Sequence, residues 1–485
     1  MKLGFASCRS ILVWVLLSLL PAPVLLAQPE TYDPMRLYPP DSLNADLRFL
    51  QARLEQLHPG LYRYATRAEL TGLFDSLYRA ISHPMNGQQF LSLLELIPAR
   101  IRNGHTMILP GAAQMNYYAT RGRSLPFLIG SFQGRLYILE NYSADAGIMP
   151  GAEVLSINGV NAAEIRRQLI ARQVRDGFNE TYPEWTMDHY FSAYYRFCFG
   201  EPDEFLLELQ GKAGEVDQKR IRASTRDSVN YYRQLRYARQ HPQSEAGLGI
   251  AVRRCEDSPA RNTRLTGDSP SHRTALLKIR SFDPDILQST YKQDYRRAID
   301  SGFEWLERMR IGRLILDLRD NQGGDFPPVR YLLAYLVSKP TQFLYGGAQQ
   351  RTIRPAAHRF TGKLVVLING GSFSSTAIIA AILQKEKRAV FVGEETGGNP
   401  TIISGDPVET LLPHTKIGCY ISTVTYRIEE RSNDGHGLVP EYPVVPGIDD
   451  WLADKDRALE KALSINCPAL ITPPALQAPD RTFPH

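Results

Sequence analysis

The stretch KLVVLINGGSFSSTAIIAAILQ, residues 363–384, decides the fold class of this sequence. After Lys363 its first residues are apolar and rich in β-branched side chains, which is typical of a strand covered on both faces in a parallel sheet. Asn369, Gly370 and Gly371 form a turn, and the small and apolar residues after it predict a buried helix. Open α/β sheets bind ligands beyond the carboxyl ends of their strands, so we expect a functional site at this turn.

Hydroxyl side chains are concentrated at this strand-to-helix junction, namely Ser372, Ser374, Ser375 and Thr376. A serine at the start of a helix commonly caps free backbone N–H groups and has no further role. The alternative is a nucleophile, which needs a base to take its proton and donors to stabilise an oxyanion. A helix start supplies such donors together with a partial positive charge. The choice between the two interpretations depends on partners elsewhere in the chain.

Strands and helices alternate around this junction, which predicts an α/β domain with a mixed, mostly parallel sheet over residues 273–465. Amphipathic helices are predicted at 289–309 and after residue 325, where Val329 and Leu333 repeat at helical spacing. The other predicted strands lie in ALLKIRSF (275–282), RLILDL (313–318) and RAVFVGEETGG (388–398).

Two further features are candidates for a place beside the hydroxyl cluster. The turn Asn321-Gln322-Gly323-Gly324 ends the strand at 313–318, and glycines there let the backbone bring N–H groups close to a ligand. Glycine pairs are also common in ordinary turns. Of the ten histidines, two are candidates for the base, namely His105 in RNGHTMIL, between a helix end and a short strand, and His436 in the glycine-rich turn SNDGHGLVP.

Helical periodicity dominates the region upstream and predicts an N-terminal helical domain over residues 42–109, with three amphipathic helices in 42–101. The expected boundary signals are the stop at His58-Pro59-Gly60 and the capping boxes Thr66-x-x-Glu69 and Asn86-x-x-Gln89.

From residue 122 to 212 the apolar period changes to two, and glycine turns separate short strands, which predicts a small β-rich domain. Residues 213–272 are polar and rich in arginine, so we expect a connector with some irregular structure. Residues 466–485 are rich in proline and predict a loose tail.

The first 27 residues predict a secretory signal, with a positive start, an apolar run at 11–26 and cleavage after Ala27. Pro21 and Pro23 interrupt the apolar run, which is short for a membrane span. We therefore expect a chain exported across the inner membrane to the periplasm or cell envelope, with no integral membrane segment after cleavage.

Charge and cysteine content exclude other classes of protein. The formal net charge of +5 falls to +3 without Lys2 and Arg9, which is too weak to indicate nucleic-acid binding. Four cysteines follow the signal, without the paired spacing of a zinc site, and an exported chain permits up to two disulfides among them. These four are Cys198, Cys255, Cys419 and Cys467.

Five segments resemble the S41 peptidases in order and spacing, namely LLKIRSF, LILDLRDNQGG, LVVLINGGSFSSTAIIAAIL, RAVFVGEETGG and DGHGLVPEYPV. These are the tail-specific or C-terminal processing proteases and their tricorn-like relatives, and the sequence is most similar to secreted members of Bacteroidetes type. GIMPGAEVLSINGV (147–160) resembles the PDZ domain of such proteases. The resemblance implies a ClpP/crotonase-like catalytic domain at 273–465 and a PDZ-like domain at 122–212.

The resemblance places the family's nucleophile on Ser374. The backbone N–H of Ser375, with that of Gly323 or Gly324, would form the oxyanion hole. It implies no metal and no organic cofactor.

The resemblance also implies the base. Many members use a lysine in the turn after the GE-x-T motif, but Asn399 occupies that place here. The tricorn-like branch uses a histidine from an upstream GHT segment, which falls on His105. Its acidic partner would be Asp434, with Glu441 as the alternative.

Two main hypotheses follow for the function. The first is a secreted serine endopeptidase that cleaves envelope or periplasmic polypeptides, with a polypeptide substrate whose C-terminus binds the PDZ-like domain. The second is a catalytically inactive protein of the same fold that binds peptides or apolar ligands. An esterase on the same core is a third, weaker interpretation.

Overall fold

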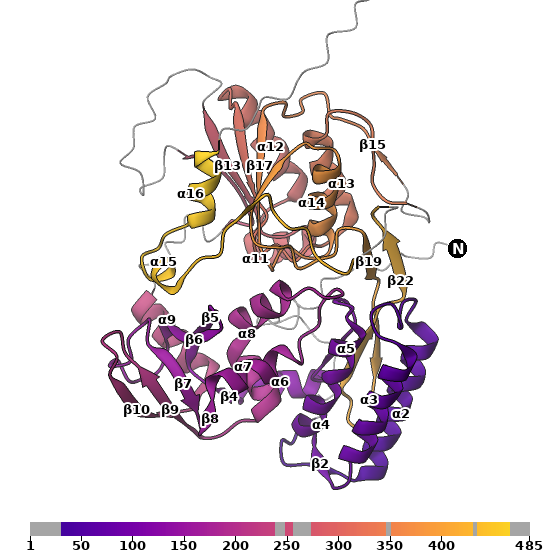
Figure 1. The fold of residues 1–485 in the computed structure, drawn as a ribbon, viewed down its shortest axis with the longest axis vertical. Coiled ribbons are helices and arrows are strands. Elements are labelled where there is room, and N and C mark those ends of the chain that lie inside the picture. Colours follow the sequence, from indigo (N-terminus) through magenta and orange to yellow (C-terminus); the bar gives the residue numbers. More distant parts are fainter. Residues whose placement is uncertain (1–30, 238–247, 256–272, 346–350, 430–433, 466–485) are drawn as a thin grey trace, which may run out of the picture.

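The computed structural model of the chain describes residues 31–237, 248–255, 273–345, 351–429 and 434–465. Figure 1 shows an α/β domain at the top, a β-rich module at the lower left and a helical domain at the lower right. The predicted signal peptide, the predicted tail and Cys467 lie outside the described residues.

A six-stranded sheet forms the centre of the α/β domain, with the order β12-β13-β14-β17-β18-β23. All neighbouring pairs are parallel except β12 and β13, which pair antiparallel at one edge. The prediction of a mixed, mostly parallel sheet is therefore confirmed. The strands are β12 (Ile250–Arg254), β13 (Thr274–Ile279), β14 (Arg313–Asp317), β17 (Lys363–Ile368), β18 (Val390–Gly393) and β23 (Tyr442–Pro443).

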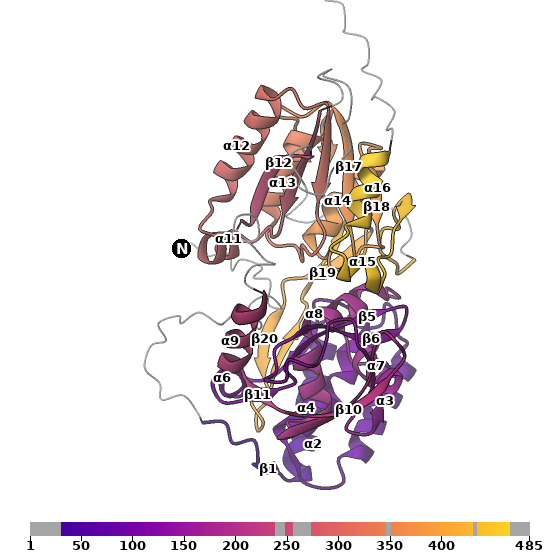
Figure 2. The same ribbon diagram turned by 90° about the vertical axis from the view of Figure 1, so that its left-hand side faces the viewer.

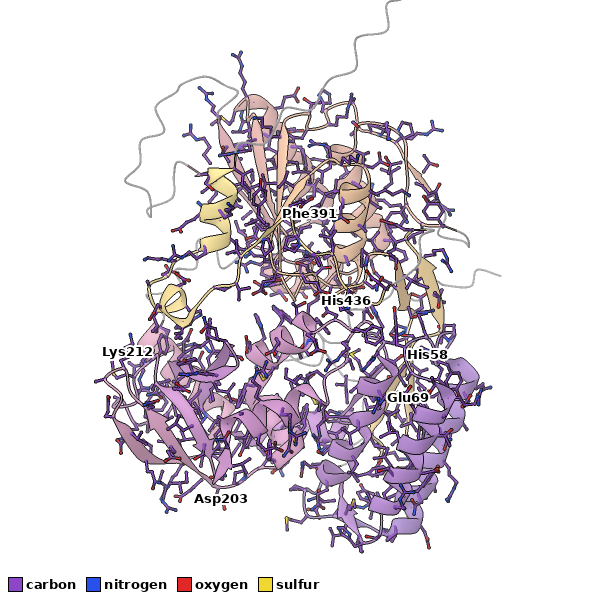
Figure 3. All side chains as sticks on the ribbon, viewed as in Figure 1. His58, Glu69, Asp203, Lys212, Phe391 and His436 are labelled. Carbon is purple, nitrogen blue, oxygen red and sulfur yellow. The ribbon has the colours of Figure 1, made fainter. Side chains whose placement is uncertain are left out.

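After Lys363 the strand β17 is apolar, because helices cover both faces of the sheet (Figure 1 and Figure 2). Val366 and Ile368 pack in the core formed with α12, α13 and α14, whereas Val365 and Leu367 pack in a second cluster with α16. Figure 3 shows Phe391 of β18 inside this domain. The helices of the domain are α11 (Pro284–Tyr291), α12 (Tyr295–Arg308), α13 (Phe326–Leu336), α14 (Ser375–Lys385), α15 (Ile448–Leu452) and α16 (Arg457–Ser464).

The prediction of a single helix at 289–309 is wrong, because the structure has two helices there. Lys292 adopts a left-handed conformation with φ 55° and ends α11. Asp294 then caps α12 by accepting a hydrogen bond from the N–H of Arg297 (2.9 Å). The apolar period runs through Tyr291 and Tyr295, so it conceals the break between them.

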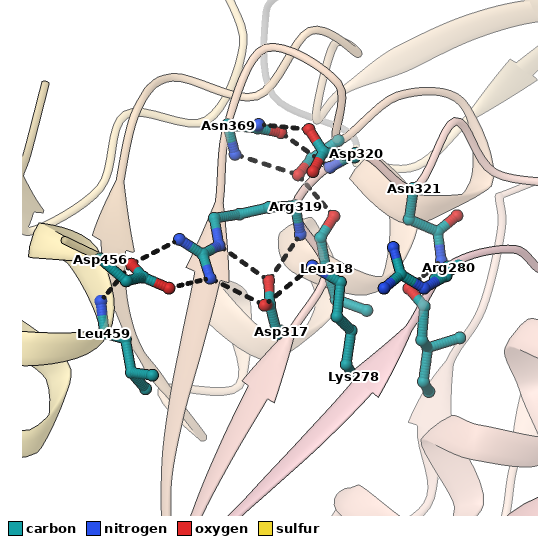
Figure 4. Close-up of polar contacts among 12 residues, drawn as sticks. Lys278, Arg280, Asp317, Leu318, Arg319, Asp320, Asn321, Asn369, Asp456 and Leu459 are labelled. Atoms are coloured by element: carbon teal, nitrogen blue, oxygen red, sulfur yellow. Dashed lines mark hydrogen bonds and ion pairs between the residues drawn. The ribbon is translucent and has the colours of Figure 1, made fainter. Parts of the chain in front are cut away.

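An ion network connects the sheet to the helix on its outer face (Figure 4). Arg319, just after β14, donates to Asp317 and also to Asp456, which caps α16, with its closest contact to each at 2.8 Å. Lys278 of β13 lies 3.3 Å from the same Asp317 carboxylate. Burial alone would raise the pKa of Asp317, but the Arg319 and Lys278 charges hold that pKa well below its usual range. Asp317 is therefore a buried anion that depends on these two cations.

We expect Arg319→Gln to lower the free energy of unfolding by about 3 kcal/mol, because it leaves a buried carboxylate with one cation instead of two. Urea denaturation followed by circular dichroism measures this change. Arg220→Gln is the control, because Arg220 pairs with Glu204 on the surface. Such an exposed pair contributes less than about 1 kcal/mol. Equal losses in the two variants would contradict the assigned role of the network.

The N-terminal domain is helical, as predicted, and both capping boxes are present at Thr66 and Asn86. The first helix ends at Leu57, just before the predicted stop. The third predicted helix is divided in two at Glu95. The elements of this domain are β1 (Leu37–Tyr38), α2 (Pro40–Leu57), α3 (Arg67–Ala80), β2 (Met85–Asn86), α4 (Gly87–Leu94), α5 (Leu96–Ile101) and α6 (Ala112–Thr120).

A hairpin of the α/β domain extends into the helical domain and determines where residue 105 lies. The strand β3 (Met107–Leu109) pairs antiparallel with β21 (Gly418–Ile421), which pairs in turn with β20 (Val408–Leu411). This pairing brings the end of the helical domain to the α/β domain. The remaining small strands are β15 (Thr341–Gln342), β16 (Thr352–Ile353), β19 (Ile402–Gly405) and β22 (Val424–Arg427).

The β-rich module has strands in the order β10-β9-β7-β6-β5, all antiparallel, with β8 paired to β7. Its helix α8 lies between the module and the α/β domain, and the sequence analysis did not predict it. The elements are β4 (Arg123–Ser124), β5 (Phe127–Phe132), β6 (Arg135–Asn141), β7 (Glu153–Ile157), β8 (Val160–Asn161), α7 (Ala162–Ile170), α8 (Thr181–Phe199) and β9 (Glu204–Gln210).

The expectation of an irregular connector at 213–272 needs correction. Its described parts contain four regular elements, namely β10 (Val216–Arg222), β11 (Ser224–Thr225), α9 (Arg226–Tyr237) and β12. The strand β10 is an edge strand of the module, and most of its side chains are exposed. An exposed strand needs no apolar alternation, which explains why the pattern did not reveal it.

Candidate active site

Ser374 lies in the turn between β17 and α14, at the N-cap position of the helix. Its backbone has φ 54° and ψ −124°, and such a sparsely populated conformation costs a non-glycine residue roughly 1–3 kcal/mol. Its side chain makes no capping hydrogen bond. The capping interpretation therefore does not apply to Ser374.

The other hydroxyls of the junction have different environments. Ser372 Oγ donates to the carbonyl of Leu318 (2.9 Å), and Thr376 Oγ1 donates to Asn321 Oδ1 (2.9 Å). The hydroxyl of Ser375 is buried and has no hydrogen-bond partner among the described residues. Of the four hydroxyls, Ser374 is the one for which the structure shows an imidazole partner.

His105 reaches Ser374 from 269 positions earlier in the chain, and its Nε2 lies 2.8 Å from Ser374 Oγ. The helix α5 ends at Ile101, and the left-handed backbone of its C-cap Arg102 (φ 58°) turns the chain toward β3. Asn103 then accepts a hydrogen bond from the N–H of His105 at 3.0 Å. The turn and the β3–β21 pairing together bring the imidazole to the carboxyl end of the parallel sheet.

The surroundings of His105 favour its neutral form. Burial lowers the pKa of His105 to about 4. The ring stacks on Phe373, with centroids 4.9 Å apart and an interplanar angle of 25°. At neutral pH the imidazole is therefore uncharged and able to accept a proton.

The predicted oxyanion donors lie beside Ser374. A Cβ on Gly323 would be 2.8 Å from Ser374 Cβ and 2.9 Å from the nitrogen of Ser375, so this turn packs directly on the serine. The N–H of Gly323 is already bonded to Asn321 Oδ1 (2.9 Å). Among the described residues, the N–H groups of Gly324 and Ser375 have no acceptor. These two groups are thus the available donors of the three that the sequence indicated.

We expect Gly323→Ala to slow turnover about 10- to 100-fold, because the new methyl group would displace Ser374 by a fraction of an ångström or more. Gly323 also has φ 96°, so alanine is strained there. The measurement is kcat together with the thermal midpoint of unfolding. Gly159→Ala is the matched control, because Gly159 has φ 78° and open space around its Cβ position. A loss of activity in the Gly159 variant as large as in the Gly323 variant would contradict the steric explanation.

The structure does not bring either predicted acid to His105. Asp434 is exposed and its carboxylate accepts a hydrogen bond from the N–H of His436 (3.0 Å), in its own turn. Glu441 accepts from the N–H of Phe391 (2.8 Å) on β18. The Nδ1 atom of His105 is buried without a hydrogen-bond partner among the described residues. The prediction that Asp434 orients the imidazole therefore needs correction.

The contacts that the structure shows for Asn399 and His436 are with residues other than Ser374. Asn399, at the position where the resemblance implied a lysine in many S41 peptidases, is buried, and its Oδ1 accepts from the N–H and hydroxyl of Thr401 (both 2.8 Å). His436 lies at the boundary between the domains (Figure 3), with its Nδ1 3.7 Å from Glu395. His105 is the histidine that contacts Ser374.

Sequence analysis missed the aromatic residues that support His105. Phe373 stacks on Tyr182 of α8 (4.2 Å between centroids), and Tyr182 stacks on Trp185 (6.0 Å). The Nε1–H of Trp185 donates to Asp320 beyond β14 (2.8 Å). The repetition of Tyr182, Trp185 and further aromatic residues at helical spacing was the signal that could have predicted this helix.

Among the described residues, no three His, Cys, Asp or Glu side chains come together as a metal site would require. No helix in the part of the chain that the structure describes has the length and apolar character needed to cross a membrane. Cys198 and Cys419 form no disulfide in the structure.

An α/β fold with a serine–histidine pair at the carboxyl edge of its sheet defines a protein of the serine-hydrolase type. Residues 273–444, which carry Ser374, match the family model described as Peptidase family S41. The α/β domain is therefore similar to peptidase family S41 over most of its length. The described elements before it, including β3 and α8, lie outside that match.

Curated relatives match part of the chain. Carboxyl-terminal-processing peptidase 2, chloroplastic, of Arabidopsis thaliana is 31% identical over 165 residues, which cover 33% of this chain and 31% of that protein. The tail-specific protease of Haemophilus influenzae is 27% identical over 219 residues, 42% of this chain and 30% of that protein. The matches thus span less than a third of the length of these two relatives.

The fold of most of the chain is similar to that of a solved structure, mature CPAF complexed with lactacystin. The comparison has a TM-score of 0.63 and covers 87% of this chain and 97% of that one. Sequence identity is 14%, so the similarity concerns the fold.

Proposed function

We propose that this chain is a serine endopeptidase that cleaves polypeptides through an acyl-enzyme on Ser374. In the first step His105 Nε2 takes the proton of Ser374 Oγ, and Oγ bonds to the carbonyl carbon of the substrate. The C–N bond then breaks, and His105 gives the proton to the leaving amine. In the second step His105 takes a proton from water, the hydroxide attacks the ester, and the proton returns to Ser374 Oγ.

The surroundings of the pair suit these steps. The low pKa of His105 keeps the imidazole neutral and ready to accept a proton at pH 7. The free N–H groups of Gly324 and Ser375 are the proposed donors to the oxygen that becomes negative in the tetrahedral intermediate. The start of α14 adds the positive end of a helix dipole at the same place.

The proposed substrates are polypeptides of the cell envelope or periplasm. The signal pattern in residues 1–27 supports export. The names of the curated relatives, which describe tail-specific and carboxyl-terminal processing, support entry of the substrate by a chain end. The proposal gives the β-rich module the PDZ-like role of binding that end by strand addition at a sheet edge.

One observation carries the proposal, namely the 2.8 Å contact between His105 Nε2 and Ser374 Oγ. A serine whose only role was to cap α14 would turn its hydroxyl toward the N–H groups of the helix, and Ser374 makes no such bond. The contact joins a strained serine to a neutral base, as nucleophilic catalysis requires.

The test uses the purified chain from which the predicted signal has been removed. It is incubated separately with three substrates, namely a reduced and carboxymethylated protein, a peptide that has a free C-terminus, and a simple ester. New peptide N-termini that form in proportion to enzyme support the endopeptidase. Ester cleavage without peptide cleavage would replace it with an esterase. Saturable peptide binding without any cleavage would replace it with the inactive binding protein.

A further inference from the structure

Asp176 lies behind the active site, on the ten-residue stretch between α7 and α8, and the serine mechanism does not use it. It is 5% exposed and belongs to neither the family match nor the predicted site. Its Oδ1 accepts a hydrogen bond from the N–H of Gly104 (2.9 Å), the residue before His105. Its Oδ2 accepts a longer one, 3.4 Å, from the N–H of Asn399.

Asp176 binds two backbone N–H groups, one next to the base His105 and the other in the turn next to the nucleophile Ser374. Gly104 precedes the base, and a Cβ there would be 2.4 Å from Phe373, next to the nucleophile. Asn399 follows Gly398, whose Cβ position is 2.9 Å from the backbone nitrogen of Ser374. The buried carboxylate of Asp176 thus connects the backbone next to His105 with the turn that packs on Ser374.

The residues that follow Asp176 make similar contacts with the same loops. The N–H of Gly177 donates to the carbonyl of Arg102 (2.9 Å), and that of Phe178 donates to Gly435 (2.7 Å). Asn179 Nδ2 donates to Glu395 Oε1 (2.9 Å). The stretch therefore holds the loop of His105 against two loops of the α/β domain.

We propose that Asp176 is the positioning residue that holds His105 at hydrogen-bond distance from Ser374, in a site where no acid among the described residues contacts the imidazole Nδ1. This inference rests on the proposed serine-peptidase function. Asp176 acts through the backbone of Gly104 and does not touch the reacting atoms. Charge matters for this role, because an ionised carboxylate accepts stronger hydrogen bonds from N–H groups than a neutral acid or amide does.

The charge of Asp176 depends on pH. Burial raises the pKa of Asp176 to about 6, against the lowering effect of the two amides and of Arg63. The ionisable groups that interact with it are Arg63 from the loop after α2 and Tyr182 of α8. His105 follows Gly104, whose N–H donates to Asp176. Protonation of Asp176 therefore precedes that of His105, whose pKa is about 4, as the solution is acidified.

The experiment measures the rate at which a fluorophosphonate labels Ser374, as a function of pH, in the wild type, Asp176→Asn and Asp46→Asn. Asp46 is a matched control, because it is also fully buried and its carboxylate accepts from two backbone N–H groups, of His414 and Thr415, at 2.9 Å. These contacts connect α2 to the turn between β20 and β21.

We expect Asp176→Asn to slow labelling at neutral pH about 10- to 100-fold, the effect of a small misplacement of a catalytic group. The wild-type rate should fall in two steps on acidification, near pH 6 and near pH 4, and the variant should keep only the lower step. Asp46→Asn should lower the melting temperature but keep the wild-type rate and both steps.

Three results would overturn the positioning role. These are wild-type labelling by Asp176→Asn, an equal loss of rate in Asp46→Asn, or a single step in the wild-type profile. The number of steps in the wild type decides the question even if Asp176→Asn does not fold. Failure of the proposed function gives a different result, namely a folded wild type in which Ser374 is not labelled at any pH.

Discussion

Ser374→Ala should reduce the rate of polypeptide hydrolysis by at least about 10⁴-fold, because removal of the nucleophile leaves only binding and oxyanion stabilisation. The fold should be retained, since Ser374 Oγ caps no helix and, within the described part of the chain, its hydrogen-bond partner is His105 alone. The measurement is kcat/KM on a carboxymethylated protein, with thermal unfolding recorded on the same samples.

Ser372→Ala is the control, because it removes a hydroxyl two positions away. Ser372 Oγ donates to Leu318 and accepts from the N–H of Asn369 (3.1 Å), so its loss should destabilise the turn by roughly 1–3 kcal/mol. Activity should be largely retained, since Ser374 and His105 keep their contact. Hydrolysis by Ser374→Ala at the wild-type rate would show that the nucleophile is another residue.

His105→Gln should lower kcat by about 10³-fold or more, because the amide fills the space but cannot take the proton of Ser374. His436→Gln is the matched control, since His436 lies beside Glu395 and has an exposed side chain. Its kcat should equal that of the wild type. If the His436 variant lost activity and the His105 variant did not, the base would be misassigned.

The variant His105→Gln should also change the pH dependence of the free energy of unfolding. The folded chain keeps His105 neutral down to about pH 4, whereas an unfolded histidine takes up a proton near pH 6.5. The unfolded state thus binds more protons between these values, so the wild type loses stability as the pH falls from 6.5 to 4. His105→Gln lacks this contribution. Its free energy of unfolding relative to that of the wild type should therefore rise as the pH falls from 6.5 to 4, which denaturant titrations measure.

The serine–histidine pair was predictable because local sequence determines each half of it. The apolar strand, the glycine turn and the small residues after it identify the position of Ser374, and the GHT segment after a helix identifies His105. The structure agrees with the expected junction, since β17 ends at Ile368 and α14 begins at Ser375. The distance between the two residues came from the structure alone.

The acidic partner was not predictable, because a short side chain in a turn follows the local backbone. Asp434 accepts a hydrogen bond from a residue two positions later, and this closure depends on dihedral angles that a motif does not encode. Asp176 was missed for the opposite reason. Its partners Gly104 and Asn399 are 72 and 223 positions away, so no local pattern connects them.

Exposed and interrupted elements were also hard to predict. The strand β10 buries Ile221 alone, which is too little to produce an apolar period, and α11 and α12 share an apolar period across a break of three residues. A hydrophobic pattern indicates which residues are buried. In these segments the pattern of burial does not follow the boundaries of the helices and strands, so it could not predict them.

The central claim, that Ser374 is a nucleophile activated by His105, is tested most directly by labelling the exported form of the chain with a fluorophosphonate and mapping the modified peptide by mass spectrometry. We predict a single adduct on Ser374 in the wild type and no adduct in His105→Gln. An adduct on another serine, or equal labelling of Ser374 with and without the imidazole, would contradict the claim.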